Sequence, residues 1–265
     1  MTARERVRGL LAGAAAGVSG GLFGVGGGLA MIPLLTGFFG FTQHQAHGTS
    51  LAVMGATALA AIVVYGAFAQ VMWPIALLVA LGSMVTARYG ARWAARTSPR
   101  GLRRAFAAFL IVVALRLLWR APEISDHPVV SGWVGIALGL LLGAAVGVLS
   151  GYMGVGGGIL AVPAFTLGLG LSQQAAQGTS LAAIVVTAPA GAIEHARHGN
   201  VVGRLVPILA IGAILGAPLA AWLAQLLPHA VLVRAFALFL LVNAVATWVR
   251  ADPRPAPRPV EVTRT

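Results

Sequence analysis

The sequence contains no cysteine and no lysine, and only six of its 265 residues are acidic. Without cysteine there can be no disulfide framework, no thiolate metal site and no thiol nucleophile. Only 9% of the residues are charged, whereas 58% are hydrophobic. A water-soluble domain carries far more charge on its surface than this, so the composition excludes an ordinary soluble protein.

Two long stretches of the chain lack any charged residue, one from Gly9 to Ala87 and the other from His127 to Ile193. Each is several times longer than the roughly 20 apolar residues that one helix needs to span a bilayer. The chain is also rich in glycine, with 35 residues, as closely packed membrane helices are. We therefore predict an all-α integral membrane protein whose main solvent is the lipid bilayer.

The formal net charge of +12 comes entirely from arginine. Arginines at helix ends and in cytoplasmic loops explain this charge, so we expect no nucleic-acid partner. The N-terminal stretch from Arg4 to Ala16 resembles a signal peptide. We reject that interpretation because the same apolar pattern recurs deep inside the chain.

The sequence repeats itself at a constant offset of 130 residues. Residues 17–52 align with residues 147–182 without a gap, and eighteen of the 36 positions are identical. Such a register indicates gene duplication. We predict a first transmembrane repeat over residues 1–126, a second over 127–250, and a disordered tail rich in proline and arginine over 251–265.

Each repeat divides into about four apolar segments, and the first segment of each is interrupted by a glycine-rich motif. That segment is either one broken span or a hairpin that enters and leaves the membrane on the same face. If both are hairpins and the N-terminus is cytoplasmic, fifteen of the eighteen arginines fall inside. The positive-inside rule therefore favours re-entrant hairpins, inverted repeats and cytoplasmic N- and C-termini.

The glycine-rich interruptions are candidate substrate sites. A break followed by a helix leaves backbone N–H groups without helical acceptors, and glycine lets a ligand approach them closely. In lipid such groups must face protein or a water-filled cavity. Close helix packing is the structural alternative. The duplicated breaks, each beside a proline, favour an anion site; its residues are Gly24, Gly26, Gly27, Gly28 and Pro33, with Gly154, Gly156, Gly157, Gly158 and Pro163.

Several polar residues near these breaks could also take part. Thr49 and Ser50, with Thr179 and Ser180, are expected to cap helix N-termini and could also contact the substrate. Gln43 and Gln173 are expected in the preceding loops. Glu194, His195 and His198 form a titratable group at a segment end, and a solvated helix end explains them better than proton coupling does. Nothing in the histidine spacing predicts a metal site.

These motifs resemble the TauE/SafE family of sulfite-exporter-type membrane permeases. The resemblance rests on residues 24–33 and 154–163 and on both Gly-Thr-Ser motifs, and it extends to 80–83 and 102–109. It implies a multi-pass permease of the cytoplasmic membrane that moves sulfite, sulfonates or related sulfur-containing carboxylates. Ala213 stands where the first repeat has Ser83, so any role of that hydroxyl would be one-sided.

The sequence therefore predicts a secondary alternating-access carrier for a small anion, coupled to H⁺ or Na⁺. An anion channel and a non-transport membrane assembly protein are the alternatives. The membrane segments lack paired carboxylates and a duplicated serine–histidine arrangement, so we expect no enzyme activity and no cofactor. The oligomeric state stays open.

Overall fold

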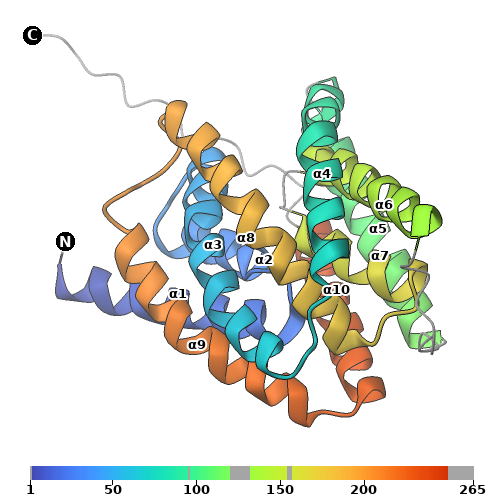
Figure 1. Ribbon diagram of the computed structural model, residues 1–265. Coiled ribbons are helices and arrows are strands. Elements are labelled where there is room, and N and C mark those ends of the chain that lie inside the picture. The colour runs from blue at the N-terminus through green and yellow to red at the C-terminus, as the bar shows by residue number, and fades with distance from the viewer. Residues whose placement is uncertain (1, 95, 120–131, 154–156, 250–265) are drawn as a thin grey trace, which may run out of the picture.

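The structure is a computed structural model, and it describes residues 2–94, 96–119, 132–153 and 157–249 (Figure 1). These residues form α-helices joined by short connections, without a strand. The helices are α1 (Ala3–Phe23), α2 (Gly28–Phe38), α3 (Gln43–Ala67), α4 (Trp73–Ala94), α5 (Pro99–Trp119), α6 (Gly132–Met153), α7 (Gly158–Gly168), α8 (Gln173–Arg197), α9 (Val206–Leu226) and α10 (His229–Val249).

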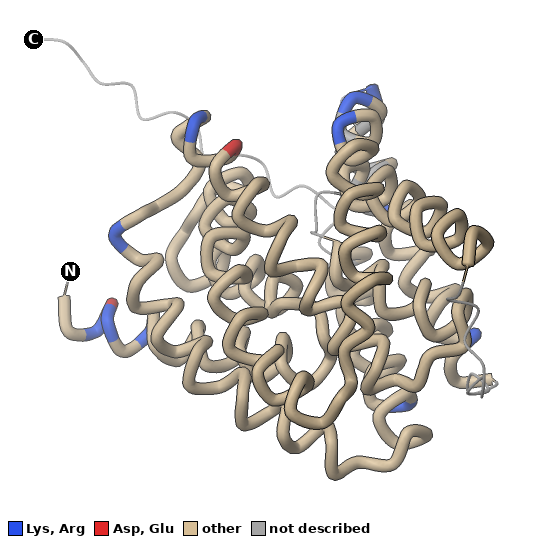
Figure 2. The backbone as a smooth tube through the Cα atoms, in the orientation of Figure 1, with Lys and Arg blue, Asp and Glu red and all other residues tan. Residues whose placement is uncertain are grey.

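The predicted all-α membrane class is confirmed. Five of the described helices are long and apolar enough to cross a bilayer, namely α3, α6, α8, α9 and α10. Figure 2 shows the charged residues near the ends of the helices, whereas the middle of the bundle carries none. This distribution keeps ionised groups out of the apolar interior, where they would be costly.

The helix bounds follow the sequence offset of 130 residues. The bounds of α2, α3 and α5 recur in α7, α8 and α10 at that offset. The predicted boundary between the repeats, near residue 126, and the predicted tail from residue 251 lie outside the described residues.

The first glycine-rich motif interrupts the helix as predicted. Gly24 ends α1 in the left-handed conformation, with φ of 69°, and its N–H donates to the carbonyl of Gly20 at 2.9 Å. Gly26 and Gly27 also have positive φ, at 68° and 80°. Side chains rarely adopt this conformation, so glycine is required for the chain to turn into α2. In the second repeat the corresponding turn between α6 and α7 includes residues 154–156, which are not described.

Helices from different repeats pack side by side. Helix α1 lies along α9, and α4 lies along α6, while α3 crosses α8 near the centre (Figure 1). Glycines make the first two contacts possible. A Cβ on Gly13, Gly17 or Gly21 would overlap the carbonyls of Leu209, Ala213 and Ala217. Small residues thus let these backbones approach closely, as in other membrane bundles.

The segment formed by α1 and α2 begins and ends at the same end of the bundle. Gly9 of α1 contacts Ile208 at the start of α9. The beginning of α3 contacts the α8–α9 connection, where Thr49 Oγ1 accepts a hydrogen bond from the Val202 N–H at 3.0 Å. Both contacts involve residues close to the start of α9, so the chain returns after α2 to the end from which it came.

The segment formed by α6 and α7 has the opposite orientation. Gly139 near the start of α6 contacts Leu78 near the start of α4. The beginning of α8 contacts the α3–α4 connection, where Thr179 Oγ1 accepts from the Met72 N–H at 3.1 Å. The two broken segments therefore enter the bundle from opposite ends.

Two local expectations from the sequence are wrong. The Gly-Thr-Ser motifs do not cap helices, because α3 and α8 begin earlier, at Gln43 and Gln173. Their caps are Thr42 and Ser172, whose hydroxyls accept from the N–H groups of Gln45 and Ala175. Each helix begins directly after one of these hydroxyls, because the hydroxyl accepts an N–H of the first turn that has no acceptor within the helix. Consequently Gln43 and Gln173 lie in the first helical turns and not in loops.

Candidate functional site

The two helix breaks meet between α3 and α8. A Cβ on Gly158, the first residue of α7, would come within 3.0 Å of Cα of Val25 in the first break. Met54 of α3 and Ile184 of α8 pack against the same junction, since a Cβ on Gly26 would contact both side chains. The two breaks thus meet in a packed junction between α3 and α8.

Serine hydroxyls from α3 and α8 face this junction. Ser180 is fully buried, and its Oγ donates to the carbonyl of Gly24 at 2.8 Å and lies 3.4 Å from the carbonyl of Gly158. Ser50, its counterpart in the first repeat, is also buried, and its Oγ has no hydrogen-bond partner among the described residues. A Cβ on Gly28 would lie 3.3 Å from that Oγ. A buried hydroxyl without a partner is costly, so Ser50 is a group available to a ligand.

Thr49 and Thr179 serve the scaffold. Both are fully buried, and each hydroxyl accepts a backbone N–H from the loop of the other repeat. These bonds hold the start of α3 against the α8–α9 connection and the start of α8 against the α3–α4 connection. Neither hydroxyl has to move for a ligand to reach the breaks.

An open cavity of about 450 Å³ leads from one end of the bundle to the junction. Its walls come from α3, α4, α6 and α8, and its lining includes Gly157 of the second break together with Met54 and Ile184. This volume falls in the range of small-molecule sites. The polar residues that line it are Ser83, Arg88, Ser150, Thr187, Glu194 and His195.

The cavity mouth carries more positive than negative charge. Glu194 is exposed and is already engaged by Arg197, whose Nη1 lies 3.4 Å from its carboxylate, and by His198 at 3.6 Å. Arg88 has no ion pair among the described residues, and its guanidinium lies over the Tyr89 ring, 5.1 Å from the centroid. A cation without a carboxylate at the entrance of a low-dielectric cavity attracts small anions.

The hydroxyls deeper in the cavity can serve an anion as donors. Ser83 Oγ now donates to the carbonyl of Ala80 at 2.9 Å, and Thr187 Oγ1 to that of Ala183 at 3.0 Å. Both are bonds within one helix that a hydroxyl can exchange for an oxyanion by rotating. Ser150 and Arg88 also line the cavity. The four residues together can offer hydrogen-bond donors to a substrate that has left bulk water.

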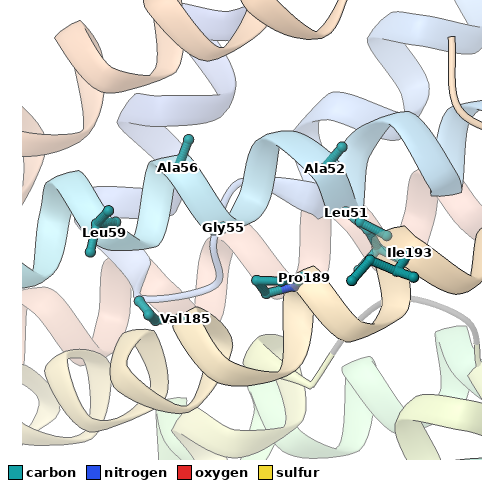
Figure 3. Close-up of a pocket in the computed structure, with 9 residues that line it drawn as sticks. Leu51, Ala52, Gly55, Ala56, Leu59, Val185, Pro189 and Ile193 are labelled. Carbon is teal, nitrogen blue, oxygen red and sulfur yellow. The ribbon is translucent and has the colours of Figure 1, made fainter. Parts of the chain in front are cut away.

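A second hollow, of about 430 Å³, lies on the outer face where α3 crosses α8 (Figure 3). Its lining consists of apolar side chains such as Leu51, Leu59, Pro189 and Ile193. The Pro189 ring lies beside Gly55. Nothing in this lining can bind a charged solute, and its composition suits hydrocarbon chains.

The candidate site residues from the sequence are thus distributed unequally. Gly157, Glu194 and His195 line the cavity, whereas Gly24, Gly26, Gly27 and Gly28 lie behind it, packed against Gln177, Met54, Ile184 and Ala16. Pro33 and Pro163 lie inside α2 and α7. His198 points to the exposed side of its turn. Gly154 and Gly156 lie outside the described residues.

Sequence reasoning did not single out Arg88, Ser150 and Thr187. Arg88 carried a signal, because it is the first charged residue after the long uncharged stretch. Thr187 also carried one, since Thr57 occupies the equivalent position of the first repeat. Ser150 corresponds to Gly20, so the repeat pattern gave no reason to select it.

A bundle of apolar helices with an open cavity that reaches a helix break and carries a few polar side chains is the architecture expected of a multi-pass membrane transporter. The family model "Sulfite exporter TauE/SafE" matches residues 1–117 and 138–264. The chain therefore belongs to the sulfite exporter TauE/SafE family, as its motifs predicted.

Similar proteins carry consistent descriptions. A "Probable membrane transporter protein" of Xylella fastidiosa is 30% identical over 257 residues, which is 94% of this chain and 96% of that protein. The "Probable membrane transporter protein YunE" of Bacillus subtilis is 28% identical over 234 residues, covering 79% of this chain and 85% of that protein.

Proposed function

We propose that the protein is a secondary, alternating-access carrier that moves a small anion of the sulfite, sulfonate or sulfur-containing carboxylate class across the cell membrane. The observation that carries this proposal is the cavity that leads past Arg88, Ser83, Ser150 and Thr187 to a helix break. These residues offer one cation and several hydroxyl donors, and the only carboxylate of the lining among the described residues, Glu194, is already paired.

The difference between the two halves supports alternating access. The cavity lies between the α4–α6 pair and α8, whereas the α1–α9 pair packs more extensively against α3. Thr57 is fully buried, whereas its counterpart Thr187 lines the cavity. Rocking of the helix pairs around α3 and α8 would exchange these environments, as inverted repeats permit.

The opposite entry of the two broken segments fits re-entrant hairpins in inverted repeats. With the N-terminus and C-terminus cytoplasmic, the cavity opens to the cytoplasm, and Arg88 lines it at that end. Substrate would then bind from the cytoplasm in the state described here. The coupling ion would be H⁺ or Na⁺, because a gradient must drive any net pumping.

The experiment is sulfite flux in proteoliposomes that contain purified wild-type protein, the Arg88→Gln variant or the Arg92→Gln variant. Loss of one charged hydrogen-bond partner should raise KM about ten- to hundredfold in Arg88→Gln. Arg92, one turn further along α4, does not line the cavity, and its variant should transport like the wild type. Unchanged flux and KM in Arg88→Gln would contradict the assigned cavity.

The same vesicles separate a carrier from a channel. A carrier saturates with substrate and accelerates exchange when unlabelled substrate is present on the opposite side. Flux that follows voltage alone and shows no such exchange would favour an anion channel. No flux of sulfite or of small sulfonates would favour an assembly protein.

A further inference from the structure

A buried tyrosine of the first repeat closes the α1–α9 side of the bundle, here called the sealed half; the α4–α6 side, which holds the cavity, is the open half. Tyr65 of α3 is fully buried, and its hydroxyl lies 2.9 Å from both the Gly21 carbonyl and Gln177 Oε1. It therefore joins three helices, because Gly21 belongs to α1 and Gln177 to α8. A Cβ on Gly178 would lie 3.1 Å from Cβ of Tyr65, so glycine allows this close approach.

The offset of 130 residues places His195 at the position of Tyr65 and His47 at the position of Gln177. The surroundings correspond as well. A Cβ on Gly48, the residue after His47, would lie 2.9 Å from Cβ of His195. Gly151, the counterpart of Gly21, lines the cavity together with His195. His195 thus lines the open mouth, and His47 stands beside it on α3, at the positions that Tyr65 and Gln177 occupy in the sealed half.

The histidines have not formed the bonds that their counterparts make. Nδ1 of His195 is buried and has no partner among the described residues. Nε2 of His47 lies 3.1 Å from the Gln43 side-chain amide, which can donate to a neutral imidazole. When the mouth closes with the packing of the sealed half, both imidazoles reach positions whose present counterparts are 0% exposed.

Burial of this kind discriminates between the charge states of the pair. A charged imidazole is costly to remove from water, and two charged imidazoles side by side repel each other. The other ionisable groups near the mouth are His44 on α3, Glu194, Arg197 and His198 on α8, and Arg88 on α4. Glu194 is the carboxylate among these groups; its side chain is 60% exposed and contacts Arg197 and His198, so water and these neighbours weaken its attraction for a protonated imidazole.

We propose that His47 and His195 bind protons and form a proton-controlled gate at the mouth of the cavity. The protonated pair holds the mouth open, and the neutral pair lets α4 and α6 close against α3 and α8. This inference rests on the proposed alternation between two states. It supplies a site where proton binding and opening are linked, as coupling to a proton gradient requires.

The absence of native cysteine permits a direct test. Ser150→Cys places a thiol inside the cavity, and Ser98→Cys places one in an exposed connection as a reference for the reagent's own pH dependence. Both single-cysteine proteins are labelled with a water-soluble maleimide from about pH 4 to about pH 8, a range that extends below that of a free histidine because both imidazoles are partly buried. The labelling rate of the Ser150→Cys protein is divided by that of the reference.

The ratio should fall severalfold as the pH rises, because the cavity closes. Combining His47→Gln with His195→Tyr transplants the pair of the sealed half, and the ratio should then be low and independent of pH. The matched control is His198→Gln, which removes an exposed histidine from the same helix end and should keep the wild-type profile. The single variants His47→Gln and His195→Gln should each reduce the pH-dependent change.

Several outcomes would overturn the gate. These are a flat ratio in the otherwise unmodified protein, an unaltered profile in the double variant, or loss of the profile in His198→Gln alone. Size-exclusion chromatography identifies variants that fail to fold, and the single glutamine variants then decide. The labelling requires no substrate, so a pH-dependent ratio combined with absent sulfite flux would contradict the proposed function and leave the gate intact.

Discussion

The α1–α9 side and the α4–α6 side of the bundle contain equivalent helices, but these helices pack differently, and the cavity described above lies on the α4–α6 side. In the first half Tyr65 joins α1, α3 and α8, and α1 and α9 pack against them. In the second half His195 stands at the same repeat position and borders the opening. The comparison shows that a duplicated sequence reaches two different packings in one molecule, and that a few substituted side chains mark the difference.

The largest expected effect comes from disturbing the α1–α9 contact of the sealed half. A Cβ on Gly21 would overlap the backbone of Ala217, so Gly21→Ala should destabilise the protein by about 1–3 kcal/mol through overpacking. The matched control is Gly37→Ala in α2, because a Cβ on Gly37 would meet no other atom within 4 Å. Thermal unfolding in detergent measures both, and equal Tm values would contradict the described contact.

Removing the hydroxyl of Tyr65 should make the sealed half resemble the open one. Tyr65→Phe removes the hydroxyl that lies against the Gly21 carbonyl and Gln177 Oε1, and the loss of its hydrogen bonding costs about 1–3 kcal/mol for buried groups. A cysteine at position 57, buried in the wild type, should then become reactive toward a maleimide added from the side where α8 begins. The control is Tyr89→Phe, whose ring is exposed on α4.

If position 57 stays unreactive in Tyr65→Phe, the hydroxyl does not hold that half closed. Reactivity that appears equally in Tyr89→Phe would point to general loosening of the bundle.

The smallest effect is expected where the halves are most alike. Thr49→Val and Thr179→Val each remove one hydroxyl that accepts a backbone N–H from a loop of the other repeat. Each should lower the free energy of unfolding by about 1 kcal/mol, and the two losses should be similar. A large difference in Tm between these variants would show that the two equivalent hydrogen bonds contribute unequally to stability.

The sequence predicted the features that depend on composition and repetition. The helical membrane class, the interruption at Gly24–Gly27 and the family follow from apolar runs and from glycines at a fixed offset. The glycine pattern could not reveal whether the break faces water or protein, because the same residue allows a ligand or a helix to come close. In the structure Gly26 contacts Met54 and Ile184, whereas Gly157 reaches the cavity.

The cavity could not be predicted from the sequence, for a related reason. Ser83, Ser150 and Thr187 lie on three helices, and their meeting depends on α4 pairing with α6 across the repeats. A single chain carries no local signal for such a pairing. The sequence placed the starts of α3 and α8 too late, because the polar residues that follow Thr42 and Ser172 are typical of loops.

The crossed pairing of α1 with α9 has a consequence for how the protein is made. The first helix leaves the ribosome long before its partner, which begins at Val206. Until then its glycine-lined side has no matching backbone to lie against, and the first half cannot complete its own structure. The membrane must therefore hold an incompletely folded first repeat during synthesis. Truncation before α9 should yield a chain that quality-control proteases degrade and not a smaller functional transporter.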